Sequence, residues 1–313
     1  MTYRHPRLFL IDGSAFIFRA FFAISDNSKT AAGLPTNAIL GFTNILLKFM
    51  KQYQPDYVGV ALDAGRVTFR NEMFAGYKAN RPEAPAELIP QLPYLRKILD
   101  ALNLPLLEVP GYEADDIIAT LCEQLCKQNC ELVVVSSDKD LMQLVSDGVK
   151  LLDSAKDRWI TRNEVVEKFG VGPEHIIQVM GLMGDTSDNI PGVKGIGGKT
   201  AGALIQRFLT LENLYARLGE LDQMNLRGAP RIRELLEKNK YNAFLSRDLA
   251  TVKRDVPLQV GLPELKFTGF NRERLRTLYL ELELTSLMNF STTVDDSLKF
   301  TGDFSHRRLG FAR

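Results

Sequence analysis

The sequence predicts a two-part chain, in which an α/β domain with a mainly parallel sheet flanked by helices precedes a smaller helical domain. Short apolar runs suited to buried strands occur at 8–11, 57–62, 132–135 and 149–152. Helical periods lie between them, and strands that alternate with helices are typical of parallel sheets covered on both faces. After about residue 171 the strand-like runs largely disappear. We therefore expect an α/β domain over 1–172 and a helical domain over 173–290.

The segments between and after the strands support this division. Helical periods cover 38–53, 94–102 and 115–127 in the first domain, and 173–183, 199–208, 229–239 and 272–282 in the second. Residues 69–95 are irregular and contain four prolines, and long irregular connections in compact domains are usually functional or mobile. We expect this stretch to cover or border the active cleft. Residues 291–313 are polar and aperiodic, which predicts a tail or linker.

The composition is that of an ordinary globular protein, with 45% hydrophobic and 25% charged residues among 313. No run approaches the ~18 apolar residues of a membrane span, and the early run at 8–11 is too short for a signal peptide. Cys122, Cys126 and Cys130 are four apart, with no fourth thiol or nearby histidine to complete a zinc set. Buried reduced thiols are the better interpretation, so we expect a cytoplasmic protein that does not bind a membrane.

Acidic residues recur beside apolar runs and glycines through the first two thirds of the chain. They are Asp12, Asp63, Glu113, Asp115, Asp116, Asp138, Asp140, Asp185 and Asp188. Three predicted strands end at or just before Asp12, Asp63 and Asp138. Parallel strands bring their carboxyl ends to one edge, where α/β sheets form their ligand crevice. Spacings of two or three residues place the other acids on shared faces, so the sequence predicts that the carboxylates converge.

Converging carboxylates require cations, because like charges a few ångströms apart cannot all stay ionised. The histidines His5, His175 and His306 lie outside the acidic clusters, so an all-oxygen site for Mg²⁺ or Mn²⁺ is expected rather than a zinc site. Two such ions about 4 Å apart can stabilise both oxygens of a phosphoryl displacement. The predicted reaction is phosphodiester hydrolysis. Helix capping is an equal alternative for Asp115 or Asp138 taken singly, but it explains the whole set poorly.

Several motifs around these acids carry a family resemblance. They include Asp-Gly-Ser at 12–14, Phe-Arg-Ala at 18–20, Tyr-Lys-Ala-Asn-Arg-Pro at 77–82, Glu-Ala-Asp-Asp at 113–116, Ser-Asp-Lys-Asp at 137–140, Gly-Asp-Thr-Ser-Asp-Asn-Ile-Pro-Gly at 184–192 and Gly-Ile-Gly-Gly-Lys-Thr-Ala at 195–201. Together they resemble the 5′-nuclease (flap endonuclease) family, especially the N-terminal 5′ to 3′ exonuclease domain of bacterial DNA polymerase I. The match extends from about residue 8 to residue 290, and no acidic position of the family pattern is missing.

The resemblance implies a PIN-like 5′-nuclease core, a helical arch at about 69–95 and a helix-hairpin-helix (H3TH) motif in the helical domain. It also implies two metal ions, with Asp138 serving both. The first ion would be held mainly by Asp12, Asp63, Glu113 and Asp115. The second would be held by Asp140, Asp185 and Asp188, while Asp116 would act directly or through water.

The resemblance further implies that the arch, under or through which a 5′ single strand passes, contacts DNA. Candidate phosphate contacts in and near the arch are Arg19, Arg66, Arg70, Lys78 and Arg81. Lys78 and Arg19 would bind the scissile phosphate and form the catalytic basic set with Arg81, and Tyr77 would stack on a base. Without the family, solvated surface charge would be the better interpretation of Lys78 and Arg81.

The hairpin at 192–200 is the second DNA-binding element that the resemblance implies. Its candidate contacts are Gly192, Val193, Gly195, Ile196, Gly197, Lys199 and Thr200. Glycines let the backbone approach a phosphate, and N–H groups at a helix start bind the anion without reading base sequence. Because family members often hold K⁺ on hairpin carbonyls, a K⁺ ion is a further expectation. Without the family, the stretch is only a glycine-rich connector.

These features predict a structure-specific 5′ nuclease, acting as a monomer in replication and repair. Its expected partners are DNA with a 5′ flap, nick or branched junction, an RNA primer strand, and a polymerase domain in the same or another chain. The net charge of +1 becomes strongly positive when the nine acids are set aside, which suits a polyanionic substrate. Two alternatives are a non-catalytic binder of branched DNA and a single-strand ribonuclease with a related core. The crowded acids argue against the first and the hairpin against the second.

Overall fold

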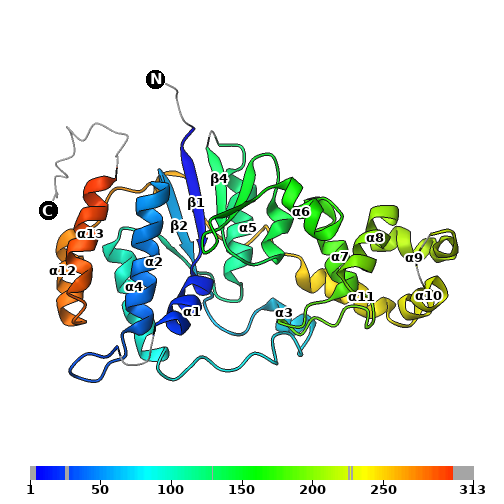
Figure 1. Ribbon diagram of the computed structural model, residues 1–313, viewed down its shortest axis with the longest axis horizontal. Helices are drawn as coiled ribbons and strands as arrows, with labels where there is room; N and C mark the ends of the chain where they lie inside the picture. Colours follow the sequence, from blue (N-terminus) through cyan, green and yellow to red (C-terminus); the bar gives the residue numbers. More distant parts are fainter. Residues whose placement is uncertain (1–4, 25–27, 129, 225, 227, 299–313) are drawn as a thin grey trace.

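A computed structural model describes residues 5–24, 28–128, 130–224, 226 and 228–298, and its centre is a six-stranded sheet (Figure 1). The strands are β1 (Arg7–Asp12), β2 (Tyr57–Ala61), β3 (Leu106–Leu107), β4 (Glu131–Val135), β5 (Val149–Asp153) and β6 (Arg158–Ile160). Their order is β3-β2-β1-β4-β5-β6, and every neighbouring pair is parallel except β5 and β6. The mainly parallel α/β sheet is therefore confirmed. The four apolar runs correspond to β1, β2, β4 and β5, whereas β3 and β6 are too short to show a periodicity.

The order of the strands determines where a ligand crevice forms. From β1 the strand order continues through β2 and β3 on one side and through β4 and β5 on the other, so the order of strands reverses between β1 and β4. In register, Asp12 at the end of β1 is opposite Ala61 of β2, and Ile11 is opposite Val135 of β4. Open α/β sheets bind ligands outside the carboxyl ends of the strands at such a switch point.

Both faces of the sheet are buried, because successive strand residues point into two different hydrophobic cores. Phe9 and Ile11 belong to a core that is shared with helices α1 (Gly13–Ala23), α2 (Asn37–Tyr53) and α4 (Leu92–Ala101). Leu8 and Leu10 belong to the other core, which is shared with α5 (Ala114–Leu125) and the 3₁₀ helix η2 (Asp140–Leu144). Helices thus cover the sheet on both sides.

The end of the described chain differs from the prediction. Helices α12 (Arg272–Glu281) and α13 (Ser286–Ser297) belong to the core of α2 and α4, not to the helical part of the chain (Figure 1). The predicted tail from residue 291 is helical as far as Ser297. Leu287, Val294 and Leu298 are buried at helical spacing, which gives this polar segment an apolar stripe that the serines and threonines around it obscure. Residues 299–313 of the predicted tail lie outside the described residues.

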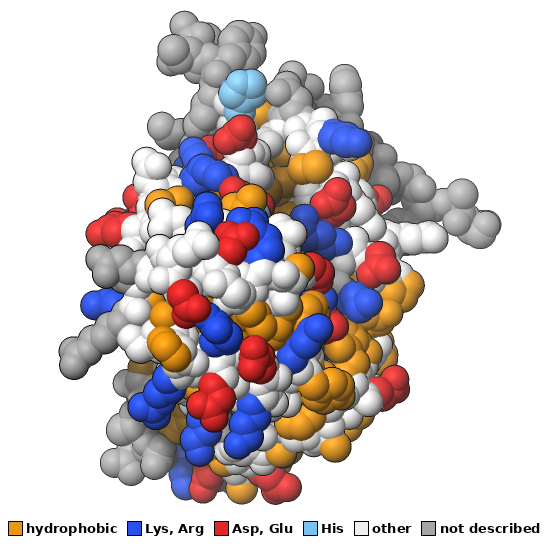
Figure 2. Space-filling view, turned by 90° about the vertical axis from the view of Figure 1, so that its right-hand side faces the viewer, with side chains coloured by type: hydrophobic (Ala, Val, Ile, Leu, Met, Phe, Trp, Pro, Cys, Tyr) orange, Lys and Arg blue, Asp and Glu red, His pale blue; other side chains and the backbone are white. Residues whose placement is uncertain are grey.

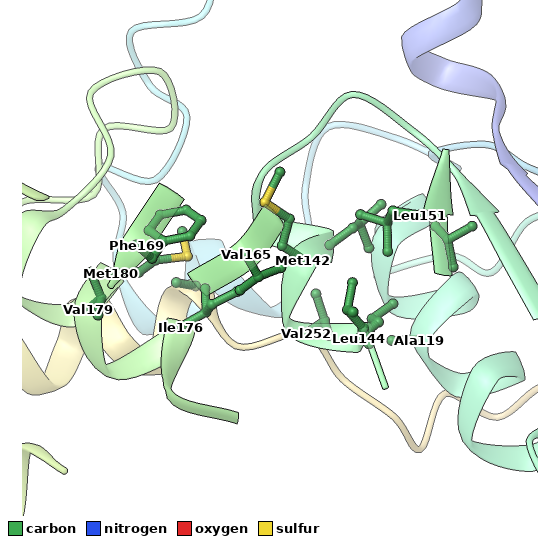
Figure 3. Packing of buried hydrophobic residues seen from close by; sticks show 14 of the residues in the cluster. Ala119, Met142, Leu144, Leu151, Val165, Phe169, Ile176, Val179, Met180 and Val252 are labelled. Carbon is green, nitrogen blue, oxygen red and sulfur yellow. The ribbon is translucent and has the colours of Figure 1, made fainter. Parts of the chain in front are cut away.

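The helical part extends away from the β6 edge of the sheet (Figure 1). It comprises α6 (Arg162–Phe169), α7 (Ile176–Met183), α8 (Gly198–Phe208), α9 (Leu211–Ala216), α10 (Ala229–Lys238) and α11 (Lys240–Ala250). One continuous core joins it to the sheet: Figure 3 shows apolar side chains from Leu151 and Leu144 through Val165 and Ile176 to Met180. The two parts therefore pack as one body at this junction.

The predicted arch is mostly not helical. Within 69–95 the structure has α3 (Phe69–Met73), the 3₁₀ helix η1 (Ile89–Gln91) and the start of α4, with turns and irregular backbone over 74–88. The prolines of this stretch remove backbone N–H groups and restrict the preceding residues, which explains the absence of a longer helix.

Figure 2 shows that basic and acidic side chains are interspersed on the outer end of the helical part. Arg207 and Arg217 both pair with Glu220, and Arg247 pairs with Glu212. The surface that the described residues form at this end of the molecule therefore carries both positive and negative charge, without a patch of a single sign. Within the described ranges, no helix is long and apolar enough to cross a membrane.

Candidate metal centre and nucleic-acid interface

The acids that follow β1 and β4 are joined by hydrogen bonds through Ser136. Asp12 caps α1, because its Oδ1 accepts the N–H of Ala15 at 3.0 Å. Its Oδ2 accepts the Ser136 hydroxyl at 2.9 Å, and the Ser136 oxygen accepts the N–H of Asp138 at 3.0 Å. The Oδ1 of Asp138 then accepts the N–H of Asp140 at 2.8 Å. Asp12 thus both caps a helix and belongs to the acidic cluster, so the two interpretations of the strand-end acids are compatible.

Asp63 links the end of β2 to the start of α5. Its Oδ1 accepts the N–H of Ala114 at 2.8 Å, while its own N–H donates to the Ser14 hydroxyl at 3.0 Å. Glu113 is the N-cap of α5, and Asp115 lies in its first turn. Acids from β1, β2, β4 and α5 therefore meet at the switch point of the sheet, as the strand-end argument predicts.

The electrostatics show how close these carboxylates lie. Burial, together with the charges of Asp63 and Asp138, raises the pKa of Asp12 to about 6 against the lowering effect of the hydrogen bonds from Ala15 and Ser136. Burial also raises the pKa of Asp115, with added repulsion from Asp138 and Asp12. As bare anions these groups destabilise one another, and a divalent cation would remove that cost.

Asp140, Asp185 and Asp188 form the other side of the cluster. Burial raises the pKa of Asp140, and repulsion from Asp138, Asp185 and Asp188 adds to it. Lys139 Nζ lies 2.7 Å from Asp185 Oδ2, and the Ser187 hydroxyl donates to Asp185 Oδ1 at 2.7 Å.

Two glycines allow the tight loop that carries Asp185 and Asp188. Gly184 and Gly192 have φ values of +66° and +59°, a region that favours glycine. A Cβ on Gly192 would lie 2.4 Å from the Gly184 nitrogen, so the two backbones touch where the loop closes. Asp185 and Ile190 exchange backbone hydrogen bonds of 2.9 and 2.7 Å across it. These contacts hold the two ends of the loop together, and the loop thereby places Asp185 and Asp188 at the cluster.

Basic side chains from the predicted arch reach into the cluster. Lys78 Nζ lies 2.6 Å from Glu113 Oε1 and 3.7 Å from Asp188 Oδ2, and Arg81 Nη2 lies 2.5 Å from Asp188 Oδ1. A cavity of about 360 Å³ opens at the acids themselves, and Asp12, Asp138, Lys139, Lys168, Asp185 and Ser187 are among the residues that line it. The arch thus supplies positive charge where the acids are most crowded.

The donor set fits a hard divalent cation, although the acids are not gathered around one point. In the described part of the chain, no three His, Cys, Asp or Glu side chains form a group that could hold a metal ion. Lys78, Arg81 and Lys139 instead occupy several carboxylate oxygens. Asp140 Oδ1, however, is buried without a hydrogen-bond partner, which is costly unless a cation satisfies it. Oxygen donors alone suit Mg²⁺ or Mn²⁺.

Asp116 corrects one prediction, because it is not placed to bind a metal directly. Its carboxylate is fully buried and accepts from Arg70 at 2.8 Å on each oxygen. It also accepts the N–H groups of Glu113 and Lys253, at 3.1 and 2.8 Å. Sequence spacing puts Asp116 on the same helix face as Glu113. Buried Arg70, however, donates hydrogen bonds to both oxygens of Asp116.

Arg70 and Tyr77 also differ from their predicted roles. Arg70 is 2% exposed and Tyr77 is 4% exposed, so neither side chain is available for a phosphate or a base. The Tyr77 hydroxyl donates to Glu113 Oε2 at 3.0 Å, and Arg70 Nη1 lies 3.3 Å from the same oxygen. Both support Glu113 from inside. An unpaired Arg or Tyr is usually a surface residue. The sequence does not reveal that Arg70 and Tyr77 pair with buried carboxylates.

The other predicted basic contacts are accessible. Arg19 is half-buried over the Phe16 ring, 4.5 Å from its centroid, and burial lowers the pKa of Arg19 against the charges of Asp153 and Asp12. Arg66 is exposed and donates to the Arg81 carbonyl at 3.1 Å. Both therefore lie near the cluster without a carboxylate at hydrogen-bond distance among the described residues.

The hairpin at 192–200 has a buried and an exposed side. Val193 and Ile196 are 2% and 3% exposed, so their side chains anchor the turn in the core. Gly195, Gly197 and Lys199 are exposed at the start of α8, where Thr200 is half-buried. Any contact made by Val193 or Ile196 must therefore come from the backbone, and the first turn of α8 has no side-chain cap for its N–H groups.

Sequence reasoning missed Ser136, Lys139 and Lys168, which contact or border the acids. Lys139 lies between two predicted acids in the sequence, and this position could have indicated that it belongs to the site. Ser136 and Lys168 become part of the site only through the fold.

Comparison with known proteins gives the family of this chain. Residues 7–170 match a family described as "5'-3' exonuclease, N-terminal resolvase-like domain", and residues 171–273 match "5'-3' exonuclease, C-terminal SAM fold". A 5'-3' exonuclease of Aquifex aeolicus is 37% identical over 281 residues, which are 90% of this chain and 93% of the relative. DNA polymerase I of Pseudomonas aeruginosa is 44% identical over 293 residues, which are 93% of this chain and 31% of that protein. The chain spans about a third of the length of the polymerase relatives that it matches.

Solved structures share the fold at lower identity. T5 5'-exonuclease with divalent metal ions (zinc) has a TM-score of 0.63 at 21% identity, covering 94% of this chain and all of that one. The catalytic core of Rad2 in complex with DNA substrate has a TM-score of 0.62 at 16% identity, covering 93% of each chain. The two family matches together span residues 7–273, and the relatives align over nine tenths of the sequence. This chain belongs to the 5′-3′ exonuclease family.

Proposed function

We propose that this chain is a divalent-metal-dependent, structure-specific 5′ nuclease, with 5′ to 3′ exonuclease and flap endonuclease activity on DNA. The observation that carries the proposal is the convergence of acids from five separate segments at the switch point of the sheet, with Lys78 and Arg81 among them. Relatives named DNA polymerase I and 5'-3' exonuclease support it, as does a structural neighbour described as a flap endonuclease bound to DNA and metal ions.

The metal-binding set is the predicted one without Asp116. It consists of Asp12, Asp63, Glu113, Asp115, Asp138, Asp140, Asp185 and Asp188, which would hold two Mg²⁺ ions, with Mn²⁺ as a substitute. Bound divalent cations would supply Lewis acidity and neutralise charge for phosphodiester hydrolysis. Asp138 serves both groups, since its charge acts on Asp12, Asp115 and Asp140 alike.

The basic side chains have two roles in this proposal. Lys78 and Arg81 pair with Glu113 and Asp188. If bound cations neutralised those acids, both side chains would be available to bind the scissile phosphate and its developing charge. Arg19 and Arg66 lie close enough to the cluster to hold neighbouring phosphates. Arg70 and Tyr77 do not contact DNA in this proposal and support Glu113 from inside.

The hairpin at 192–200 holds duplex DNA away from the cut. Its exposed backbone at Gly195 and Gly197, with Lys199 and Thr200 at the start of α8, suits a phosphate and a K⁺ ion on neighbouring carbonyls. The substrates are DNA with a 5′ flap, nick or branched junction, and an RNA primer strand. The protein would act as a cytoplasmic monomer in primer removal and repair, together with a polymerase domain in the same or another chain.

The test is an end-labelled 5′-flap DNA incubated with Mg²⁺, with Mn²⁺ and with a chelator, and the products sized. We expect a cut near the base of the flap with either ion and none with the chelator. Binding of the flap without cleavage in Mg²⁺ and Mn²⁺ would make the chain a non-catalytic binder. Equal cleavage of unbranched single-stranded RNA would favour the ribonuclease alternative.

A further inference from the structure

The segment that leaves α11, residues 249–253, is held against the acid-bearing part of the molecule by buried Arg70. Arg70 Nε donates to the Leu249 carbonyl at 2.9 Å, and Nη2 donates to the Thr251 carbonyl at 3.1 Å. The same guanidinium binds both oxygens of Asp116 and lies 3.3 Å from Glu113 Oε2. One side chain thus fixes the start of α5 and the backbone after α11 to each other.

Gln143 makes a second, independent connection from the same segment. Its Nε2 donates to the Ala250 carbonyl at 2.9 Å and to the Asp140 carbonyl at 2.8 Å, and its Oε1 accepts the N–H of Val252 at 3.2 Å. Gln143 is 8% exposed, so these hydrogen bonds are shielded from water. The amide therefore holds the turn that carries Asp140 to the segment that Arg70 holds to Glu113.

The middle of α11 reaches the loop of the remaining acids through Ser246. The hydroxyl of fully buried Ser246 accepts the N–H of Gly192 at 2.8 Å. Gly192 closes the loop that carries Asp185 and Asp188 by its contact with Gly184. Helix α11 and residues 251–253, which we call the α11 brace, therefore touch all three acid-bearing segments outside the strand ends.

We propose that the α11 brace sets the spacing of the acidic cluster for metal binding, with Gln143 and Arg70 as its positioning residues. The reason is electrostatic: carboxylates that repel one another stay close only where the backbone that carries them is held in place. Groups that orient metal ligands commonly change metal affinity about 10- to 100-fold when removed. The inference rests on the proposed function for its metal, but it assigns residues that touch neither metal nor substrate.

The test compares the Mn²⁺ affinity of Gln143→Met with that of wild type in the absence of DNA. Electron paramagnetic resonance of the unbound ion measures this affinity. Methionine keeps the length of the side chain and removes its three hydrogen bonds. We expect Mn²⁺ affinity to fall about 10-fold or more. In single-turnover cleavage of flap DNA, the Mg²⁺ concentration at half-maximal rate should rise by a similar factor, while the rate at saturating Mg²⁺ changes much less. Arg70→Lys keeps the positive charge but loses the planar guanidinium group with its several N–H donors. It should also lower the Mn²⁺ affinity.

The control is Val294→Ala, a truncation of a fully buried residue in α13, which packs on α2 far from the brace. It reports what loss of stability alone does to Mn²⁺ binding. If Gln143→Met and Val294→Ala lower the melting temperature alike and bind Mn²⁺ alike, the brace is only structural and the inference fails while the proposed function stands. If wild type binds Mn²⁺ but does not cut flap DNA, the proposed function fails, and weaker Mn²⁺ binding by Gln143→Met still supports the brace.

Discussion

Lys78 Nζ lies 2.6 Å from Glu113 Oε1, so a basic residue of the irregular stretch before α4 neutralises an acid at the start of α5. The pair brings together segments that are 35 residues apart in sequence. It also defines a competition, because the Lys78 ammonium and a divalent cation cannot both use the same Glu113 oxygen. If a divalent cation took that oxygen, Lys78 would be available to contact the phosphate.

Lys78→Ala tests this competition. We expect the single-turnover cleavage rate at saturating Mg²⁺ to fall by about 10²-fold, the order seen when one group that stabilises developing charge is removed. Affinity for Mn²⁺ in the absence of DNA should be unchanged or higher, because a competing cation is lost. Lys127→Ala, at an exposed site in another part of the surface, is the matched control. An unchanged cleavage rate would remove Lys78 from the mechanism.

Asp63→Asn and Asp138→Asn should each abolish cleavage while DNA binding persists. Both keep the size of the side chain, and the amide oxygen can still accept the hydrogen bonds from Ala114 and Asp140. Only the negative charge that a metal ion needs is lost, so we expect a rate loss of at least about 10²-fold with flap-DNA affinity in Ca²⁺ within a few-fold of wild type. Cleavage at the wild-type rate would contradict the assignment of the site.

Asp116→Asn should act mainly on stability. The change leaves the buried Arg70 charge without its bidentate partner, which is expected to cost about 3–5 kcal/mol of unfolding free energy. Urea denaturation measures this directly. The comparison is Asp222→Asn, which breaks the exposed pair with Arg233 and should cost below ~1 kcal/mol. Similar costs for both variants would show that Arg70 does not depend on Asp116.

Gly192→Ala should open the loop of Asp185 and Asp188. The new Cβ would meet the Gly184 nitrogen at 2.4 Å and would also require the strained φ of +59°. Gly170 has a similar φ of +74° with nothing within 4 Å of a Cβ, so Gly170→Ala measures the backbone strain alone, about 1 kcal/mol. A larger loss for Gly192→Ala, together with weaker Mn²⁺ binding, is the expected result. Equal losses in stability and intact Mn²⁺ binding would show that the close contact is not needed.

Lys199→Ala tests the hairpin at 192–200 through salt dependence. If Lys199 contacts one phosphate, the slope of log affinity for flap DNA against log salt should fall by about 1, equally for DNA of different base sequence. Cleavage of bound substrate at saturating protein should be nearly unchanged, because Lys199 lies exposed at the start of α8, outside the segments that carry the acids. An unchanged slope would place the duplex elsewhere.

Sequence patterns were enough to predict the parallel sheet and to place several acids at one edge of it. Apolar runs of strand length, each followed by an acid, require carboxylates at one edge wherever such strands align in parallel, and Asp12, Asp63 and Asp138 lie there for that reason.

Only the tertiary structure decided which charged residues face inward. Arg70 and Lys78 are both basic residues in the same irregular stretch, yet Arg70 is buried against Asp116 while Lys78 lies at the accessible side of Glu113. The difference depends on the carbonyls of Leu249 and Thr251, about 180 residues away in sequence. Gln143 likewise gains its role from partners more than 100 residues away. Long-range hydrogen bonds of this kind leave no periodic pattern, because each depends on a single pairing that the complete fold creates.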